Sequence, residues 1–313
     1  MTPVSNPSTT PSARPTTFGR RFPNAACLPL ALLVAAAGCT EQPTAPDSNP
    51  GAPAVLVGAG DIAVCGSDAD EATALLLDTM AGTVFTTGDN AYEDGTAQEF
   101  TDCYHPSWGR HRSRTRPSPG NHDYHTPGAS GYYDYFGTSA GDPAEGYYSY
   151  DLGAWHVVAI NSNIDLSANS PQLQWLAADL AANPTVCAAA YWHHPRFSSG
   201  MHGNDAGMQA LWQVLYDAGV DVVMNGHDHD YERFAPQDPA GNADTQRGIR
   251  EFVVGTGGRS LRNFGTVAAN SEVRNSDTHG VLKLSLNASR YAWEFVPVAG
   301  QTFRDSGSTA CHQ

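Results

Sequence analysis

The segment TVFTTGDNAY at residues 83–92 joins a short apolar strand pattern directly to a carboxylate. Its β-branched and aromatic residues favour a buried strand over 83–89, which ends at Gly88-Asp89. The segment AVLVGAG at 54–60 is also an apolar strand pattern that leads directly to a carboxylate, because Asp61 follows it immediately. Loops at the carboxyl ends of strands are where α/β sheets place their functional sites. The two acids therefore predict a site at one edge of a sheet.

Helix and strand patterns alternate along the rest of the chain. Amphipathic helices are expected at 69–80, 170–182 and 206–219, the second with Ser170 as N-cap and Pro171 at its first position. Strand patterns cover 115–123, 146–162 as a hairpin, 185–192, 221–226, 251–258, 280–288 and 290–298. This alternation indicates α/β layers, and the hairpins predict mixed rather than purely parallel sheets.

Three more strand ends carry side chains that bind metals well: Asn121, His193 and the pair His227 and His229. A single acid after a strand is most often a turn residue or a helix cap. Five junctions that all offer oxygen or imidazole donors are not explained by capping. Because the set holds no thiolate, it suits iron, manganese or zinc better than a cysteine-bound structural zinc.

Asp61 and Asp89 are expected to approach each other closely at this site. Two bare carboxylates about 4 Å apart repel by roughly 4 kcal/mol at an effective dielectric of 20. Without a cation, one of them would have to bind a proton. Metal ions at a separation of about 3.5–4 Å would remove that conflict and form a clamp for in-line displacement.

One competing interpretation starts from GAGDIA at 58–63, which matches the G-x-G-x-x-G/A pattern of dinucleotide-binding loops. Asp78 even follows Gly58 by 20 residues. In that fold, however, the acid follows the second strand, whereas Asp78 lies late in the predicted helix. A nucleotide site would also leave the other four junctions unexplained, so we favour the metal site.

In chain order, the five junctions resemble the calcineurin-like metallophosphoesterases. The blocks that carry the resemblance are Gly60-Asp61, GDNAY at 88–92, GNHD at 120–123, YWHHP at 191–195 and GHDH at 226–229. GDNAY and GHDHDYER (226–233) are similar to purple acid phosphatases within that superfamily. The resemblance covers roughly residues 54–300 and implies an α/β fold, a four-layer α/β/β/α sandwich with mixed sheets. One departure is Asp61-Ile62-Ala63, where the family usually has D-x-G or D-x-H.

The resemblance implies two metal ions, Fe(III) plus a divalent ion that is iron, zinc or manganese. The ligands of the ferric site fall on Asp61, Asp89, Tyr92 and His229. Asp89 bridges to the second ion, whose other ligands fall on Asn121, His193 and His227. Tyr92 favours Fe(III), because a phenol with a pKa of about 10 ionises at neutral pH only beside a strong Lewis acid.

Two further histidines, His122 and His202, match the catalytic residues that lie outside the metal ligands in the family. The implied reaction is in-line attack of a metal-bound hydroxide on phosphorus. His122 would protonate the leaving group or hold it in place, and His202 would orient the phosphate. Asp123 is expected to orient the loop rather than to bind metal. His194 adjoins a ligand, but side chains alternate along an extended segment, so we expect it to point elsewhere.

Residues 1–38 have the pattern of a signal peptide, with Arg14, Arg20 and Arg21 before the apolar stretch CLPLALLVAAAG at 27–38. The small residues directly before Cys39 resemble the lipobox of bacterial lipoproteins, whose cysteine is lipidated. The alternative is ordinary cleavage nearby, which leaves Cys39 a free thiol. A linker at 39–53 and a catalytic domain at 54–313 follow. We expect an exported protein, periplasmic or on the cell surface, whose membrane contact is the lipid on Cys39.

Export would place the remaining cysteines, Cys65, Cys103, Cys187 and Cys311, in an oxidising compartment. Four cysteines allow three pairings of two disulfides. We favour Cys65–Cys103 with Cys187–Cys311, because the first two flank one early segment.

The composition limits the classes of protein to which this chain can belong. Among 313 residues, 17 are Lys or Arg and 32 are Asp or Glu, a formal net charge of −15. Such a chain lacks the basic footprint that nucleic-acid binding requires. With 41% hydrophobic residues, it can form a substantial core.

The pattern and the resemblance together predict an exported binuclear-metal phosphatase that hydrolyses phosphate monoesters, an acid phosphatase. The first alternative is a metal-dependent phosphodiesterase or nucleotidase of the same superfamily, because leaving-group pockets lie in variable loops such as 94–112 and 234–250. The second alternative is a non-catalytic surface lipoprotein that keeps the fold.

Overall fold

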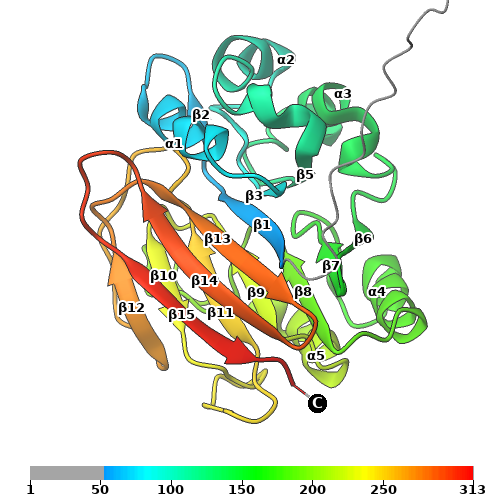
Figure 1. Ribbon diagram of the computed structural model, residues 1–313. Coiled ribbons are helices and arrows are strands. Elements are labelled where there is room, and N and C mark those ends of the chain that lie inside the picture. Colours follow the sequence, from blue (N-terminus) through cyan, green and yellow to red (C-terminus); the bar gives the residue numbers. More distant parts are fainter. Residues whose placement is uncertain (1–52, 313) are drawn as a thin grey trace, which may run out of the picture. The chain divides into compact units, whose positions relative to one another are not determined.

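The computed structural model describes residues 53–312, which fold around two mixed β-sheets (Figure 1). Helices cover the outer side of each sheet, so the predicted four-layer α/β/β/α architecture is confirmed. The predicted signal peptide, Cys39 and all of the predicted linker except residue 53 lie outside the described residues. Within 53–312, none of the helices has both the length and the apolar character needed to span a bilayer.

The first sheet has the strand order β15-β14-β13-β1-β3-β5. Its strands are β1 (Ala54–Ala59), β3 (Thr83–Thr87), β5 (Thr115–Ser118), β13 (Gly280–Asn287), β14 (Arg290–Pro297) and β15 (Asp305–Ala310). β1, β3 and β5 run parallel, while β13, β14 and β15 pair antiparallel. The three parallel strands therefore end at the same edge.

The second sheet has the order β12-β10-β11-β9-β8-β7-β6. Its strands are β6 (Tyr148–Leu152), β7 (Trp155–Ala159), β8 (Cys187–Tyr191), β9 (Val222–Asn225), β10 (Tyr231–Phe234), β11 (Arg250–Val254) and β12 (Ser271–Asn275). β7, β8, β9 and β11 are parallel. β6 pairs with β7 as the predicted antiparallel hairpin. Two short strands, β2 (Ala63–Val64) and β4 (Ala91–Tyr92), pair beside the first sheet.

The main helices lie where the sequence predicts them. They are α1 (Ala69–Asp78), α4 (Pro171–Ala182) and α5 (Gln209–Asp217), the last preceded by the 3-10 turn η5 (Ala206–Met208). The Ser170 hydroxyl accepts a hydrogen bond from the Leu173 amide at 3.3 Å, which confirms the N-cap. α4 and α5 bury apolar side chains against the second sheet, and α1 packs on the first.

Apart from strand β5, the region between β4 and β6 contains short helices and turns of helix that the sequence analysis did not predict. It contains α2 (Ala97–Glu99), η1 (Phe100–Tyr104), η2 (Trp108–Arg114), η3 (Pro127–Ala129), α3 (Ser130–Phe136) and η4 (Gly137–Ala140). Each piece is shorter than three turns, so no amphipathic period is long enough to recognise. Strands β10, β12 and β15 were missed as well, because their sequences YERF, SEVRN and DSGSTA lack an apolar run.

Two disulfides join parts of the fold that are far apart in sequence. Cys187 at the start of β8 bonds to Cys311 after β15, with a Cα–Cα distance of 5.5 Å. Cys65 bonds to Cys103 in η1, with a Cα–Cα distance of 4.8 Å. The favoured pairing is therefore confirmed, and the first bond ties the two sheets together.

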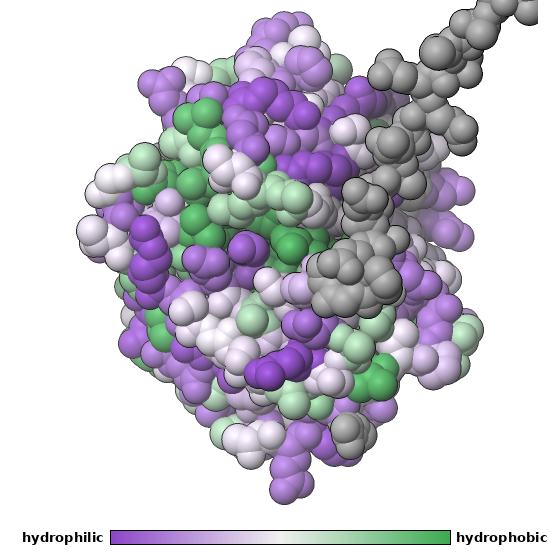
Figure 2. Space-filling view, in the orientation of Figure 1, coloured by the Kyte–Doolittle hydropathy of each residue, from purple (hydrophilic) through white to green (hydrophobic). Residues whose placement is uncertain are grey.

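Much of the surface visible in Figure 2 is hydrophilic, with apolar residues gathered near α1 and the adjoining strands.

The dinucleotide interpretation does not hold in the fold. The loop after β1 runs into β2, and α1 begins only at Ala69, so the glycines of 58–60 do not open a helix as that motif requires.

Candidate metal centre

The candidate site lies where the loops after β1, β3, β5, β8 and β9 meet, at the carboxyl edges of both sheets. Backbone hydrogen bonds fix these loops to one another. The Asp61 amide donates to the Gly88 carbonyl at 3.0 Å, and the Gly226 amide donates to the His193 carbonyl at 3.0 Å. The Gly60 amide also donates to Val254 at 3.0 Å, which links the two sheets. The site therefore rests on rigid strands.

Four of the predicted ligands form one tight group. The Tyr92 hydroxyl lies 2.8 Å from Asp61 Oδ1, 2.9 Å from Asp89 Oδ2 and 3.4 Å from His229 Nε2. Asp61 Oδ1 is 3.4 Å from His229 Nε2. Adjacent ligands of an octahedral ion with bonds of about 2.1 Å lie about 3 Å apart. This group has the spacing of a ligand set around one ion.

A second group lies on the other side of Asp89. His193 Nε2 is 2.9 Å from Asn121 Oδ1, 3.1 Å from His227 Nδ1 and 3.4 Å from Asp89 Oδ1. Asp89 thus presents Oδ2 to the first group and Oδ1 to the second. Ligand atoms of Asp61, Asp89 and His193 all lie within 4.8 Å of one another. The seven predicted metal ligands therefore lie in two adjacent groups that share one carboxylate.

Three of these residues hold an unusual backbone conformation. Asp61, Asp89 and His227 have φ values of 59°, 51° and 69°, in the left-handed region. Such a conformation costs of order 1–3 kcal/mol for a residue with a side chain, and it clusters at functional sites. Here it is held by hydrogen bonds from the His122 amide to Asp89 Oδ1 at 2.8 Å and from the His227 amide to Asp61 Oδ2 at 2.9 Å.

Two motif glycines are required by close approach to the ligands. A Cβ on Gly120 would lie 2.1 Å from Asp89 Oδ1. A Cβ on Gly226 would lie 2.6 Å from Asp61 Oδ2. The glycines of GNHD and GHDH are therefore present because no side chain fits between the loop and the carboxylate.

The acids of the site are almost fully buried, and this dominates their electrostatics. Burial, together with the neighbouring Asp89 charge, raises the pKa of Asp61 to about 7. Burial and then the two carboxylates raise the pKa of Tyr92 well above its usual value. Burial would also raise the pKa of Asp89, but its contact with His193 outweighs this and holds the pKa well below the usual range. Two carboxylates and a phenol thus cannot all ionise without added positive charge.

The imidazoles respond to the same surroundings. Burial lowers the pKa of His229 to about 4, so its ring is neutral at pH 7. Burial and the nearby His193 lower the pKa of His227 far below its ordinary value. His193 is the exception, because the Asp89 charge overcomes the effect of burial and raises its pKa to about 9. These neutral rings and oxygen donors fit two metal ions, whose charge would replace the proton on His193.

Hydrogen bonds at the far nitrogens orient two of the rings. His193 Nδ1 lies 2.8 Å from the Thr87 carbonyl, and His229 Nδ1 lies 2.9 Å from the Ser260 carbonyl. A carbonyl partner requires an N–H on Nδ1, so Nε2 carries the free lone pair in the neutral ring. In both residues Nε2 is the atom that lies among the other donors. Outer hydrogen bonds of this kind are typical of metal-binding histidines.

The two predicted catalytic histidines flank the site. His122 Nδ1 is 2.6 Å from the Glu93 carbonyl, Nε2 is 3.9 Å from Asp89 Oδ2, and the ring packs on Tyr92 with centroids 4.5 Å apart. His202 stacks on His227 with ring centroids 4.0 Å apart. Both side chains are partly exposed, at 24% and 39%. They stand between the ligand groups and solvent.

Several residues of the site were not identified from the sequence. Asp228 holds His202 through Oδ1 at 2.8 Å from Nδ1, and its position inside GHDH is the signal that would have found it. Arg259 lies over the Tyr92 ring, 4.6 Å from its centroid, and pairs with Glu93. Arg259 follows β11 in a loop with no local motif, so only the fold brings it here. Asp123 accepts from the Gly120 amide at 2.8 Å and orients the loop as expected.

The expectation for His194 is wrong. Its ring lies 4.5 Å from the His227 ring and 4.9 Å from the His193 ring, at the site rather than away from it. Burial and the adjacent His193 lower its pKa to about 3. The chain leaves the regular strand at Tyr191, so side chains no longer alternate across a sheet at His193 and His194.

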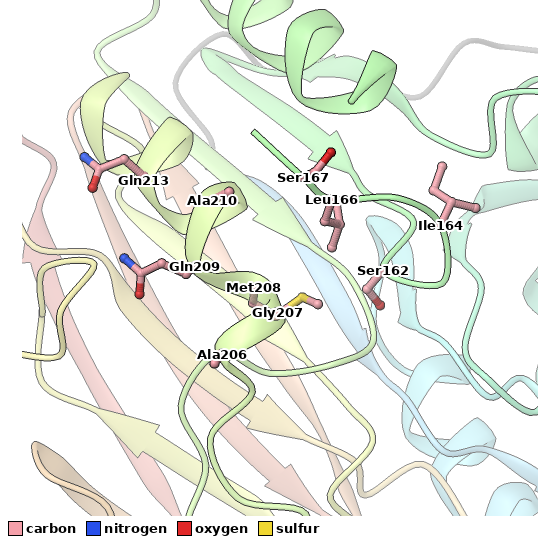
Figure 3. A pocket seen from close by; sticks show the side chains of 10 residues that line it. All are labelled: Ser162, Ile164, Leu166, Ser167, Ala206, Gly207, Met208, Gln209, Ala210 and Gln213. Carbon is pink, nitrogen blue, oxygen red and sulfur yellow. The ribbon is translucent and has the colours of Figure 1, made fainter. Parts of the chain in front are cut away.

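A cavity of about 610 Å³ adjoins this corner of the molecule (Figure 3). It lies between the loop after β7 and the start of α5, and none of its lining side chains carries an ionisable group. Ser162 links it to the site, because Ser162 lines the cavity while its Oγ is 2.7 Å from His194 Nδ1.

Both the sequence and the fold of this chain are similar to those of known phosphoesterases. Residues 48–231 match the calcineurin-like phosphoesterase family. Purple acid phosphatase 21 of Arabidopsis thaliana is 31% identical over 188 residues, which cover 53% of this chain and 41% of that protein. A nucleotide pyrophosphatase/phosphodiesterase of Hordeum vulgare is 24% identical over 269 residues, 71% of this chain and 70% of that protein.

Among solved structures, the purple acid phosphatase PPD1 of yellow lupin matches with a TM-score of 0.68 at 19% identity, over 84% of this chain and 54% of that chain. This likeness shows a shared fold. The chain spans only 18% to 41% of the length of the first three Arabidopsis purple acid phosphatases that it matches. The family match covers more than half of the chain, and with the shared fold it shows that the chain belongs to the calcineurin-like phosphoesterase family.

Proposed function

We propose that this protein is a binuclear metallophosphatase that hydrolyses phosphate monoesters, of the acid phosphatase type. The observation that carries the proposal is the shared carboxylate of Asp89, with Oδ2 2.9 Å from the Tyr92 hydroxyl and Oδ1 3.4 Å from His193 Nε2. One carboxylate between two ligand groups is the arrangement that a pair of ions requires. The similarity to purple acid phosphatases supports the same conclusion.

Fe(III) at the Tyr92 group and a divalent iron, zinc or manganese ion at the Asn121 group fit the donors. The pKa of Tyr92 lies well above its usual value because of burial and two neighbouring acids, so only a strong Lewis acid would ionise it. The two ions together would outweigh the charge of two carboxylates and one phenolate. When bound, they supply an activated nucleophile and positive charge for the phosphate.

The residues around the ions position the substrate and move a proton. His122 is anchored through Nδ1 on the Glu93 carbonyl at 2.6 Å, which leaves Nε2 on the solvent side of Asp89. From there it can donate a proton to the leaving alkoxide. His202, held by Asp228, orients the phosphate beside His227.

The experiment is metal analysis with a visible spectrum and a phosphatase assay of the full exported chain. We expect two ions per chain, hydrolysis of p-nitrophenyl phosphate that chelation abolishes, and a phenolate-to-iron absorption that disappears in Tyr92→Phe. A Phe100→Leu variant, altered at a buried ring outside the site, serves as the control and keeps the colour. A chain that binds no metal and hydrolyses no ester would contradict the proposal and favour a non-catalytic surface protein.

A phosphodiesterase or nucleotidase is the second candidate, favoured by the likeness to the Hordeum vulgare enzyme named above. The comparison of bis(p-nitrophenyl) phosphate with p-nitrophenyl phosphate separates the two. We expect a higher kcat/KM for the monoester. A higher kcat/KM for the diester would assign the second activity instead.

We further propose export and a lipid anchor, with a signal peptide at 1–38, Cys39 as the lipidated residue, a linker at 39–53 and the catalytic domain at 54–313. The two disulfides support an oxidising compartment. Labelled fatty acid should be incorporated into the wild-type chain and lost in Cys39→Ser. Equal label in both chains, or no label in either, would rule out this anchor.

A further inference from the structure

His194 offers a ring nitrogen to the second ligand group. One nitrogen of each of His193, His194 and His227 lies within 4.8 Å of the other two. The ring centroid distances from His194 are 4.9 Å to His193 and 4.5 Å to His227. The three imidazoles therefore lie close enough together to bind one ion.

A serine fixes the direction of the His194 ring. Ser162 Oγ lies 2.7 Å from His194 Nδ1 and accepts the His194 backbone N–H at 3.2 Å. When Nδ1–H also donates to this oxygen, the neutral ring keeps its free lone pair on Nε2. Within residues 53–312, Nε2 makes no hydrogen bond to a protein group. His193 is anchored through Nδ1 in the same way, on the Thr87 carbonyl.

The position of Ser162 makes this anchor a property of the fold. Ser162 follows β7, whereas His194 follows β8, and the two strands are parallel neighbours. Ser162 is one of the residues that line the adjoining cavity, and Figure 3 shows it on a loop, which is the loop that follows β7. The hydroxyl therefore reaches His194 across the sheet edge at which the site lies.

We propose that His194 Nε2 is an additional ligand of the second ion, with Ser162 as the residue that positions its ring. This inference rests on the proposed binuclear centre and extends it. The second ion would then have three imidazoles, the Asn121 amide oxygen and the Asp89 carboxylate. Imidazole-rich sites suit zinc and divalent iron, whereas manganese prefers oxygen donors. The site would therefore select zinc or divalent iron.

The test uses the full exported chain, stripped of metal, reloaded with cobalt(II) and labelled with ¹⁵N in histidine. Ring N–H signals of imidazoles bound to cobalt(II) are strongly shifted by the unpaired electrons. We expect shifted signals from His193, His227, His229 and His194, and loss of one of them in His194→Phe, which keeps an aromatic ring against His227. In Ser162→Ala, the His194 Nδ1–H loses its hydrogen-bond partner, and its shifted signal should broaden through faster exchange with water. The matched control is His125→Phe, an exposed histidine that contacts Glu93 and Asp94, and all four shifted signals should remain.

Calorimetric titration of zinc(II) into the metal-free chain gives a second readout. We expect the weaker of two binding steps to lose at least about tenfold in affinity in His194→Phe and the stronger step to stay unchanged. Two ions bound with unchanged affinities and an unshifted His194 signal would overturn the inference while leaving the proposed function intact. A wild-type chain that binds fewer than two ions would instead remove the proposed function.

Discussion

Asp89 is the residue on which the rest of the site depends. It is 1% exposed, adopts a φ of 51° and faces both ligand groups with its two oxygens. The His122 amide donates to Oδ1 at 2.8 Å, so the backbone of GNHD is anchored on the same carboxylate that would bridge the ions. A single side chain thus links both ligand groups to the loop that carries His122.

At this scale, His122→Ala should lower kcat by about 10²–10⁴-fold, the usual contribution of a general acid, with metal content retained. The ring touches Tyr92 and lies 3.9 Å from Asp89 Oδ2, so its removal deletes the proton donor but none of the ligands. Steady-state kinetics and metal analysis of the purified variant measure both effects. The control is His125→Ala, a neighbouring exposed ring, for which we expect less than about a twofold change, within the range of neutral surface substitutions. Near-normal turnover of His122→Ala at every pH would show that the role is wrong.

At the scale of elements, the site is built from loops that leave the carboxyl ends of strands in two different sheets. β1, β3 and β5 supply Asp61, Asp89 and Asn121, and β8 and β9 supply the histidines at 193 and 227. The loops approach so closely that they leave no room for a Cβ at Gly120 and Gly226. Local geometry in each loop is therefore coupled to metal binding.

This coupling predicts the effect of a single methyl group. Gly120→Ala places a Cβ 2.1 Å from Asp89 Oδ1, so the loop or the carboxylate has to move. Movement of the shared carboxylate should release metal and reduce activity at least tenfold. Changes to residues that orient metal ligands typically reduce metal affinity or activity 10–100-fold. Metal content by mass spectrometry is the measurement. Gly66→Ala adds backbone strain at a φ of 83°, but nothing lies within 4 Å of the new Cβ, so this control should retain both ions. If Gly120→Ala bound two ions as tightly as wild type, the proposed position of the loop would be incorrect.

At the scale of the whole molecule, two sheets support the site, and two disulfides cross-link the fold outside it. Cys187 is the first residue of β8, while His193 follows the last, so the Cys187–Cys311 bond lies at the opposite end of that strand from the site. Acids outside the metal-ligand set are buried as well. Asp230, Glu232 and Glu251 all have pKa values raised by burial.

Removal of the distant disulfide should affect stability and leave catalysis unchanged. The double variant Cys187→Ala, Cys311→Ala opens a cross-link between residues 124 apart in sequence. We expect a loss of about 2–5 kcal/mol in the free energy of unfolding, as for native disulfides of exported domains. Denaturant unfolding gives this value, and kcat at 25 °C should match that of wild type. A variant as stable as wild type would show that the bond adds no constraint.

The buried acids predict how the stability of the metal-free protein depends on pH. The folded protein holds protons on Asp61 and Asp123, whose pKa values are raised to about 7 by burial first and then by the Asp89 charge. An unfolded Asp releases its proton near pH 3.9. The stabilisation from these protons is thus complete below about pH 4 and is lost as the pH rises to about 7.

The lowered pKa values of His194 and His229 act in the opposite direction up to about pH 6.5, so the acids are tested by comparing variants. Asp61→Asn is neutral at every pH and removes the Asp61 contribution alone. The change in Tm of the chelated protein from pH 5 to pH 7.5 should therefore be less unfavourable in Asp61→Asn than in wild type. Equal changes in Tm in the two chelated proteins would contradict the raised pKa of Asp61.

Much of this protein follows from local sequence, because the signals are strong and short in range. The apolar runs of 54–60 and 83–89 end in acids, Ser170-Pro171 starts α4, and the hairpin at 146–162 forms as expected. The nine predicted site positions come together because parallel strands deliver their loops to one edge. The favoured cysteine pairing is also the one in the fold.

Only the tertiary structure decided where side chains point once the chain leaves regular strands. His194 faces the site because Ser162, on a neighbouring strand's loop, holds its ring, and no spacing along the chain encodes that contact. Strand β10 carries the buried Glu232 inside the sheet because the Ser199 amide donates to its carboxylate at 2.7 Å. Such polar positions lack the apolar period from which strands are recognised, so their partners are fixed by long-range packing alone.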